Sequence, residues 1–204
     1  MRSVDRETWS RRKAEFHARM REDRVIGYLD PGIEEVLEEF FRRPGSYTTS
    51  SCSGRVTLVD APWPWSRRDS TVVLRTHDPV TREEVLRILR QPVLHVLWLV
   101  AVGPIIHVEA LDMEEAFRIL DLARRAGFKH SGILSVSEKG VLVELRTGIR
   151  IAAPLRRGER ILVSMEALDD IIEMANAAVL EGRQRLERLA RLLREANNSS
   201  PIFT

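Results

Sequence analysis

Residues 95–127 read HVLWLVAVGPIIHVEALDMEEAFRILDLARRAG, and this stretch decides the class of fold. Two short apolar runs, His95–Ala101 and Ile105–Ala110, are typical of strands, and Gly103-Pro104 between them predicts a turn. The segment Asp112–Ala126 then has apolar residues at helical spacing and ends before a glycine, which often closes a helix. The stretch therefore predicts a strand–strand–helix unit.

The same order recurs on both sides of this unit. Upstream, Ser53–Asp60 and Ser70–His77 are predicted strands, and the capping-box pattern Thr81–Glu84 opens a helix. Downstream, Gly132–Ser137 and Val141–Thr147 form a predicted hairpin. Hairpins pair antiparallel, and the helices are expected on a separate layer. We predict an α+β fold in which three strand–strand–helix units form a mainly antiparallel sheet or barrel-like core.

Helices are expected on both sides of this core in the sequence. The N-terminal segment predicts one helix over residues 6–24 and a second one with Asp30 as N-cap and Pro31 at the first helical position. The last helix, Met165–Ala196, has a leucine-rich second half that is expected to project from the body or to pack on a second subunit. We predict a single domain over 1–204, divided into N-terminal helices (1–45), an α+β core (46–163), a long C-terminal helix (164–196) and a tail (197–204).

The composition excludes several classes of protein. The 204 residues include 32 basic and 30 acidic ones, a net charge of +2, so a nucleic-acid site must be a local patch. The single cysteine, Cys52, excludes a disulfide scaffold and a zinc finger. No H-E-x-x-H motif or close acidic cluster indicates a metal, and no G-x-G occurs, which argues against Rossmann and P-loop sites.

The chain has features of a cytoplasmic protein from a hot environment. The N-terminus lacks the apolar core of a signal peptide, and the longest apolar run, Val96–Val102, is far shorter than the roughly 20 residues of a membrane span. We therefore expect a cytoplasmic protein without a membrane partner. Amides are few and charged residues are many, which fits a protein from a hot environment. Arginine accounts for 29 of the 32 basic residues, and the base composition of the genome is an alternative reason for this excess.

The stretch from Ser46 to Arg55, SYTTSSCSGR, is expected to be a loop between a helix and a strand. Its hydroxyl and backbone N–H groups can surround an anion, Gly54 allows a ligand close to the backbone, and Arg55 can clamp a carboxylate or phosphate. A Ser/Thr-rich loop that satisfies its own backbone is the alternative. Cys52 is either a nucleophile or, more often for a lone cysteine, a small buried side chain.

Two histidines lie in equivalent positions of two predicted units. His77 ends one predicted strand and His107 lies within another. Either can serve as a general base, because imidazole titrates near neutral pH. Core packing or capping is the alternative role for both side chains.

Two segments have features of RNA-binding surfaces. Residues 60–68, DAPWPWSRR, place two tryptophans beside two arginines, which suits stacking on unstacked bases unless both rings pack back on the core. Residues 139–163 contain six basic and two acidic side chains, a local charge of +4. This charge indicates either a phosphate-binding patch or a solvated basic face.

The hydroxyl-rich stretch resembles the signature of the tRNA wybutosine-synthesizing protein 3 family. Similar elements follow in the family's order over nearly the whole chain: Thr76-His77, Pro104–Val108, Ala126–Ile133, Leu145–Thr147 and Ala153–Leu155. Two positions depart from the pattern. His130 stands where the family often has Asn, and Thr147-Gly148 replaces a serine.

The resemblance implies an enzyme that uses S-adenosylmethionine, without a metal, to methylate N4 of a 7-aminocarboxypropyl-demethylwyosine base at position 37 of tRNA(Phe). The implied pathway is the biosynthesis of wybutosine derivatives, and the expected partner is the anticodon region of the tRNA. The alternatives are a non-catalytic tRNA-binding or scaffolding module of the same pathway, and an enzyme that uses Cys52 covalently. The chain is expected to be a monomer or a weak dimer.

The resemblance also distributes roles among the candidate residues. Arg55 would hold either the carboxylate of the donor or that of the aminocarboxypropyl chain. The assigned residues are His107 and His77 as candidate bases, Ser50, Ser51, Ser53 and Arg55 for the donor, and Thr49, Trp63, Trp65, Arg67, Arg68, Ser131 and Arg146 for the RNA.

Overall fold

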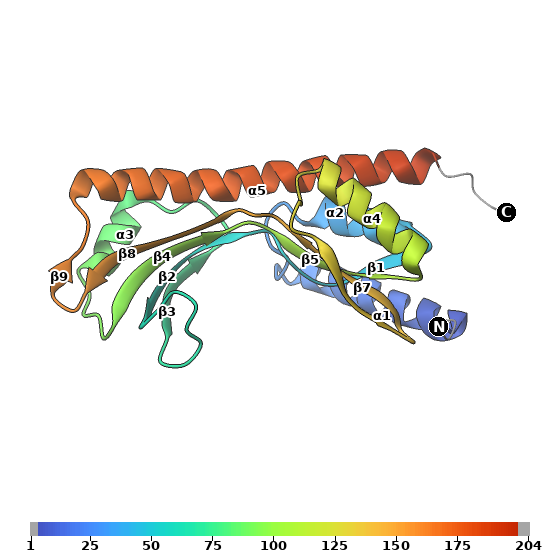
Figure 1. Ribbon diagram of the computed structural model, residues 1–204, viewed down its shortest axis with the longest axis horizontal. Helices are drawn as coiled ribbons and strands as arrows, with labels where there is room; N and C mark the ends of the chain where they lie inside the picture. The colour runs from blue at the N-terminus through green and yellow to red at the C-terminus, as the bar shows by residue number, and fades with distance from the viewer. Residues whose placement is uncertain (1–3, 200–204) are drawn as a thin grey trace. The chain divides into compact units, whose positions relative to one another are not determined.

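The computed structural model describes residues 4–199, which form five helices and nine strands (Figure 1). The helices are α1 (Arg6–Val25), α2 (Glu34–Arg42), α3 (Arg82–Leu89), α4 (Met113–Arg125) and α5 (Met165–Ser199). The strands are β1 (Ser46–Cys52), β2 (Arg55–Ala61), β3 (Thr71–Thr76), β4 (Val96–Val102), β5 (Ile105–Ala110), β6 (Gly132–Ser137), β7 (Gly140–Arg146), β8 (Arg150–Arg157) and β9 (Arg160–Ile161).

The chain folds into two compact units, each assembled from segments that are far apart in the sequence. Unit 1 comprises Met1–Ser53, Pro104–Gly148 and Arg183–Thr204, and unit 2 comprises Gly54–Gly103 and Ile149–Gly182. The chain therefore passes between the units four times, and α5 contributes its first half to unit 2 and its second half to unit 1.

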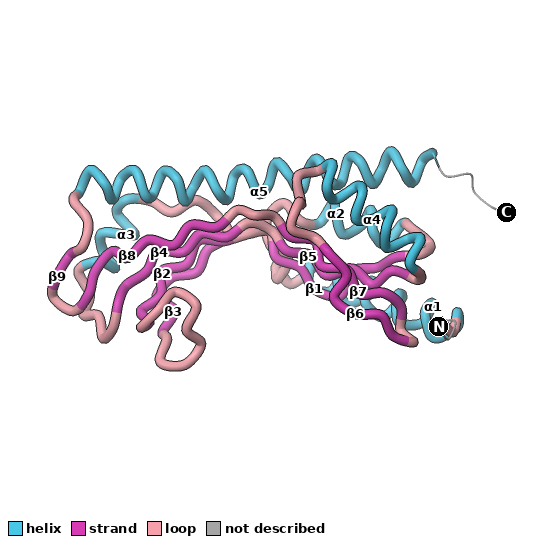
Figure 2. The backbone as a smooth tube through the Cα atoms, in the orientation of Figure 1, coloured by secondary structure: helices cyan, strands magenta, loops and turns pink. Residues whose placement is uncertain are grey.

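Unit 1 is built on a four-stranded antiparallel sheet in the order β1-β5-β7-β6. One face buries alternate residues of β5 and β7 in a core with α2, α4 and α5: Ile106, Val108, Val143 and Leu145. On the other face, α1 covers one end of the sheet (Figure 2). There the rings of Trp9 and Phe16 lie 4.8 and 5.5 Å from that of Tyr47.

Unit 2 is built on a five-stranded antiparallel sheet in the order β3-β2-β4-β8-β9. Alternate residues of its strands form a core with α3 and the first half of α5: Val56, Leu58, Val85, Leu97, Leu99, Leu155, Leu168, Ile172 and Val179. Both helices lie on the same face of this sheet (Figure 1). The opposite face therefore carries no helix of this unit within the described residues.

These sheets confirm the predicted α+β class and the antiparallel pairing. Within residues 4–199 neither sheet closes into a barrel, so the barrel-like alternative is wrong. Strand β8 was not among the predicted strands, and it contains Pro154, which cannot donate a hydrogen bond to the ladder. The register shifts opposite Leu97 and Trp98, so Pro154 sits beside a bulge, where proline is tolerated.

Two details of the helices also differ from the prediction. α2 begins after Ile33, and Asp30 is not its cap but accepts the backbone N–H of Ser53 at 2.8 Å. Three leucines in the second half of α5 are buried in the core of unit 1: Leu186, Leu189 and Leu193. This half of the helix therefore does not project from the body, and these leucines are not exposed for packing on a second subunit. Among the described helices none has the length and apolar character needed to cross a membrane.

Candidate active site

The hydroxyl-rich stretch is the edge strand β1 rather than the expected loop. Threonine is a good strand former, and the first residues of β1 are buried, so the backbone of this stretch pairs with β5 instead of turning back on itself. The register shifts between Thr48 and Ser50, which makes Thr49 the extra residue of a β-bulge. Bulges re-aim the side chains that follow them, and Ser50 and Ser51 beyond this bulge are exposed.

Three polar side chains form a hydrogen-bonded row across β1, β5 and β7. His107 pairs with Ser50 on one side and with Glu144 on the other, so all three side chains lie on the same face of the sheet. Ser50 Oγ lies 2.7 Å from Nδ1 of His107, and Glu144 Oε2 lies 3.2 Å from Nε2. The face is open at this point, since the side chains of His107 and Glu144 are 31% and 24% exposed.

The partners of His107 determine where its ring proton lies. An ionised carboxylate only accepts hydrogen bonds, so Nε2 donates to Glu144. Nδ1 then carries the lone pair and accepts the hydroxyl proton of Ser50. This arrangement can pass a proton from Ser50 to the imidazole and stabilise the resulting positive charge.

The next row on this face holds Cys52, Ile105 and Arg146. Cys52 is half-buried and Arg146 is exposed. Ser131 Oγ accepts the backbone N–H of Arg146 at 3.0 Å and donates to the carbonyl of Phe128 at 2.7 Å. The Ser131 hydroxyl therefore fastens the loop before β6 to the end of β7.

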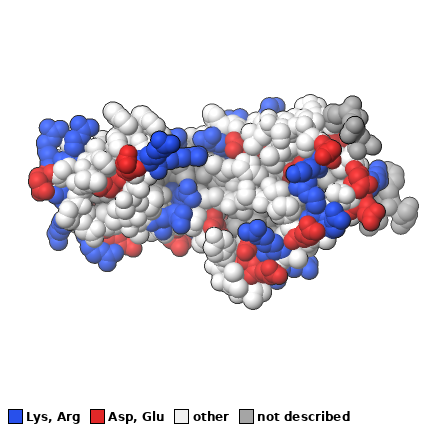
Figure 3. Space-filling model, turned by 90° about the horizontal axis from the view of Figure 1, so that it is seen from below, with Lys and Arg blue, Asp and Glu red and all other residues white. Residues whose placement is uncertain are grey.

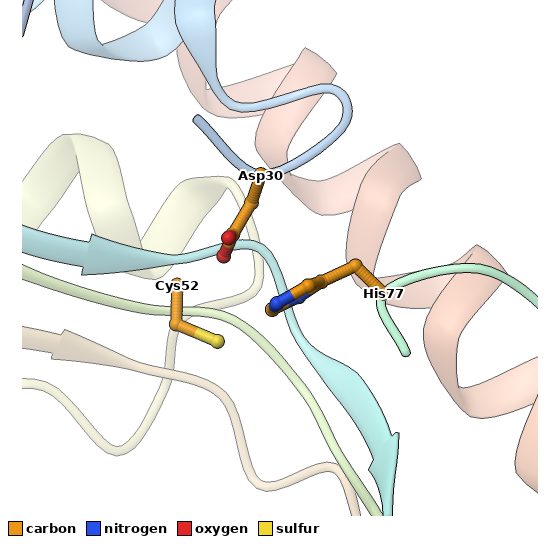
Figure 4. Close-up of side chains that lie close together, drawn as sticks. All are labelled: Asp30, Cys52 and His77. Carbon is orange, nitrogen blue, oxygen red and sulfur yellow. The ribbon is translucent and has the colours of Figure 1, made fainter. Parts of the chain in front are cut away.

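Two hydroxyl groups at the ends of these strands are buried and have no hydrogen-bond partner within residues 4–199: Ser53 Oγ and Thr147 Oγ1. Most buried polar groups are hydrogen-bonded, so each unsatisfied one marks a place where a ligand or water can complete the bonding. The backbone of Ser53 is held by the carboxylate of Asp30, which lies beside the end of β1 with Cys52 (Figure 4). The strand end is thus fixed while the Ser53 hydroxyl stays unsatisfied.

Two further predicted site residues belong to unit 2. They are Arg55, which was predicted to bind the methyl donor, and His77, the second candidate base. Arg55 is half-buried at the start of β2. His77, drawn in Figure 4, follows β3, and its Nδ1 lies 2.7 Å from the carbonyl oxygen of Gly54. Gly54 has φ +94°, and a Cβ there would lie 2.8 Å from the carbonyl oxygen of Val102. Only glycine fits this close approach of two strands.

The loop between β2 and β3 presents two aromatic rings to solvent. Trp63 and Trp65 stack on each other with centroids 5.5 Å apart and planes 5° apart, and they are 52% and 68% exposed. The alternative in which both rings pack back on the core is therefore wrong. Arg67 and Arg68 on the same loop are exposed.

One member of the basic segment 139–163 has a structural role. Arg156 is 7% exposed and donates to the carbonyls of Gly158, Leu89 and Gln91. This guanidinium fastens β8 to the end of α3 and is not available to a phosphate. The predicted phosphate-binding patch therefore contains one basic group fewer than the sequence indicates.

Comparison with known proteins identifies the family of this chain. Residues 11–195 match the family described as Methyltransferase TYW3. The chain belongs to this family. Membership in the TYW3 family confirms the resemblance that the hydroxyl-rich stretch indicates.

Relatives of this TYW3 chain are similar over most of their length. A protein of Saccharolobus solfataricus is 44% identical over 179 residues, 87% of this chain and 86% of that protein. One of Aeropyrum pernix is 41% identical over 175 residues, 85% of this chain and 93% of that protein. Both are named tRNA(Phe) 7-((3-amino-3-carboxypropyl)-4-demethylwyosine(37)-N(4))-methyltransferase.

Two solved structures share the fold of this TYW3 chain. A Pyrococcus horikoshii protein superposes with a TM-score of 0.86 at 30% identity, covering 92% of this chain and 97% of that one. A hypothetical protein from Aeropyrum pernix gives 0.74 at 37% identity, covering 81% and 98%.

The two departures from the TYW3 family pattern lie against each other. A Cβ on Gly148 would lie 2.5 Å from Nε2 of His130, so the glycine makes room for the imidazole. The backbone N–H of His130 also donates to the carbonyl of Arg146, beside the strand end.

Two residues at this candidate site were not predicted from the sequence. Glu144 alternates with apolar residues along β7, which places it on the face away from the core, but the sequence does not reveal that His107 lies opposite. Asp30 precedes a Pro-Gly pair that reads as a helix start, and its contact with Ser53 bridges segments far apart in the sequence.

Proposed function

We propose that this chain transfers a methyl group from S-adenosylmethionine to N4 of the 7-(3-amino-3-carboxypropyl)-4-demethylwyosine base at position 37 of tRNA(Phe), a step in wybutosine-derivative biosynthesis. Membership in the TYW3 family and the names of the Saccharolobus and Aeropyrum relatives support the proposal. The observation that carries it is the hydrogen-bonded row of Ser50, His107 and Glu144 on an open sheet face.

Methylation of a ring N–H requires that nitrogen to lose its proton as the new N–C bond forms. In the proposed mechanism Ser50 Oγ accepts the N4 proton while its own hydroxyl proton passes to Nδ1 of His107. Glu144 stabilises the imidazolium that results. The alternative base is His77, whose Nδ1 lies 2.7 Å from the carbonyl oxygen of Gly54 in unit 2.

The donor supplies an electrophilic methyl group when it is bound. We propose that Ser50, Ser51 and Ser53 hold it. The buried, unsatisfied Ser53 hydroxyl supports this assignment, because the donor's carboxylate, amine and ribose hydroxyls all require polar partners. We propose that Arg55 binds a carboxylate, either that of the donor or that of the aminocarboxypropyl chain. For the RNA substrate we propose Thr49, Ser131 and Arg146 on unit 1 and Trp63, Trp65, Arg67 and Arg68 on unit 2.

Single-turnover methyl transfer to tRNA(Phe) carrying the demethyl precursor tests the proposal. We expect Ser50→Ala and His107→Ala to lower the rate, the latter by the roughly 100- to 10,000-fold that a general base contributes. Ser135→Ala, an exposed serine on β6 of the same sheet, is the matched control and should leave the rate unchanged. A folded His107→Ala variant with the wild-type rate would show that the base is misassigned.

Thermal unfolding separates the enzyme from the non-catalytic alternative. A donor that binds only the folded chain raises the melting temperature as its concentration increases. We expect this rise with S-adenosylmethionine and a smaller one in Ser53→Val, which removes the unsatisfied hydroxyl. A chain that binds tRNA, shows no donor-dependent shift and transfers no methyl group is a scaffolding module.

A further inference from the structure

One face of the sheet in unit 2 has no helix of this unit over it within the described residues and forms a largely apolar floor. Along β2 and β4, buried residues alternate with half-buried ones that point to the other face, and the register places Thr57 opposite Val100 and Val59 opposite Trp98. On β8 the exposed Ala152 and Pro154 extend this floor: they pair with Val100 and Trp98, respectively.

Basic side chains surround this floor. The five strands of unit 2 contain six arginines and one aspartate. The aspartate, Asp60, accepts the backbone N–H groups of Leu94 and His95, and Arg156 is held by carbonyls. The register places the other five arginines on the open face: Arg55, Arg75, Arg150, Arg157 and Arg160. We call this surface the basic sheet face.

The helix layer on the other side of the same unit has the opposite charge. The part of α5 that belongs to unit 2, Met165–Gly182, contains five acidic residues and no basic one. Unit 2 is therefore polarised across its two layers. Viewed from below, the left part of Figure 3 shows white, uncharged atoms with blue basic groups around them and some red acidic groups between these.

An aromatic surface adjoins the basic sheet face. The stacked, exposed rings of Trp63 and Trp65 lie on the loop that leaves β2. Trp98 on the floor donates from Nε1 to the carbonyl of Ala61 at 3.1 Å, which places its ring at the base of that loop. Exposed rings beside a flat apolar floor can stack on bases that are not paired.

We propose that the basic sheet face binds unpaired nucleotides of an RNA, with its arginines other than Arg55 on the phosphates and the tryptophans on the bases. The positive charge matches a polyanion, and the exposed aromatic and apolar surface favours a single strand over a duplex, whose bases are hidden in the stack. This inference rests on the proposed function, which makes RNA the substrate. It adds a binding surface that the transfer chemistry does not require.

Binding of a synthetic anticodon stem-loop of tRNA(Phe) tests the inference, without donor and over a range of salt concentrations. The Arg75→Ala/Arg150→Ala variant should bind more weakly, and the slope of log K against log salt should fall by about 0.7 for each lost phosphate contact. Trp65→Ala should weaken binding roughly 5- to 150-fold, as expected for the loss of one stacked base. Arg87→Ala, an exposed arginine on α3, is the matched control and should bind like the wild type.

Three results would overturn the inference: wild-type binding by both test variants, equal affinity for a blunt duplex of the same stem, or equally strong competition by polyglutamate. The binding experiment measures no methyl transfer, so these outcomes are distinct from failure of the proposed function, which the methyl-transfer assay tests. If the test variants bind normally while His107→Ala loses methyl transfer, only the basic sheet face is wrong. If the variants lose binding and the wild type transfers no methyl group, only the proposed reaction is wrong.

Discussion

Glu144 lies across the strand ladder from His107, and its carboxylate oxygen is 3.2 Å from Nε2 of that ring. The carboxylate keeps the ring proton on Nε2 and leaves Nδ1 free to accept a proton from Ser50. In the proposed mechanism Glu144 is a positioning residue, because it would act on the reaction through the imidazole.

Removing the Glu144 carboxylate is expected to slow methyl transfer and to change the ring tautomer. Glu144→Ala should lower the single-turnover rate, by less than the roughly 100- to 10,000-fold contribution of the base itself. Glu144→Gln should restore part of the rate, since its carbonyl oxygen also accepts a hydrogen bond. The ¹⁵N chemical shifts of His107 report the tautomer. Unchanged shifts in Glu144→Ala would contradict this role.

Gly54 is expected to tolerate no side chain. Gly54→Ala combines a left-handed backbone, φ +94°, with a Cβ 2.8 Å from the Val102 carbonyl oxygen, so it should lower the free energy of unfolding by more than the roughly 1–2 kcal/mol cost of a left-handed residue alone. Gly158→Ala is the matched control: φ is +54° and no atom lies within 4 Å of the added Cβ. Urea denaturation measures both, and equal losses would show that the close approach is unimportant.

A buried ion pair joins α2 to α4 in unit 1. Arg43 donates to Glu115 through two nitrogens, at 2.6 and 2.9 Å, and both side chains are less than 10% exposed. Glu115→Ala leaves the guanidinium without this partner and should cost about 3–5 kcal/mol of stability. On the exposed surface of α4, Glu114→Ala removes the partner of Arg118 and should change little. Comparable losses in the two variants, measured by urea denaturation, would contradict the importance of burial.

The stability of the protein is expected to depend on Lys13 above neutral pH. Burial lowers the pKa of Lys13 from its usual 10.5 to about 8, with Glu115 partly opposing the shift. Below pH 8 both folded and unfolded chains are protonated there, and the buried charge opposes folding. Between pH 8 and 10.5 the unfolded chain binds the extra proton, so this group makes the fold more stable as the pH rises.

Lys13→Met removes the titrating group and so isolates its contribution. The difference in unfolding free energy between Lys13→Met and the wild type should be most favourable to the variant at pH 7–8 and should shrink towards pH 10. Urea denaturation at several pH values measures it. A difference that does not change with pH would show that Lys13 titrates normally.

Local patterns predicted most of the elements in this fold. The apolar runs on either side of Gly103-Pro104 became β4 and β5, and the periodic segment after Asp112 became α4 with that residue as its cap. These signals lie within a few residues of each other. The strand β1 gave no such signal, because its serines and threonines suit a turn equally well and its pairing partner, β5, lies far along the chain.

The candidate site was predictable as a set of residue types but not as an arrangement. The hydroxyl-rich stretch and His107 were both found from the sequence, yet their contact depends on a bulge after Thr48 that sets the register. A one-residue change of register moves every side chain to the other face. Glu144 and Asp30 were missed for the same reason, since each acquires its partner only through pairing of distant segments.

The repeated passage of the backbone between the two units has a consequence for how the protein can be made and dissected. Neither unit is a single continuous segment of the chain, because the segment Gly54–Gly103 interrupts unit 1 and the segment Pro104–Gly148 interrupts unit 2. A nascent chain on the ribosome cannot complete the first unit until the residues after Arg183 have emerged. A cut at one point therefore yields no fragment that is one complete unit by itself, and a dissected version of this enzyme would have to be rejoined by new linkers.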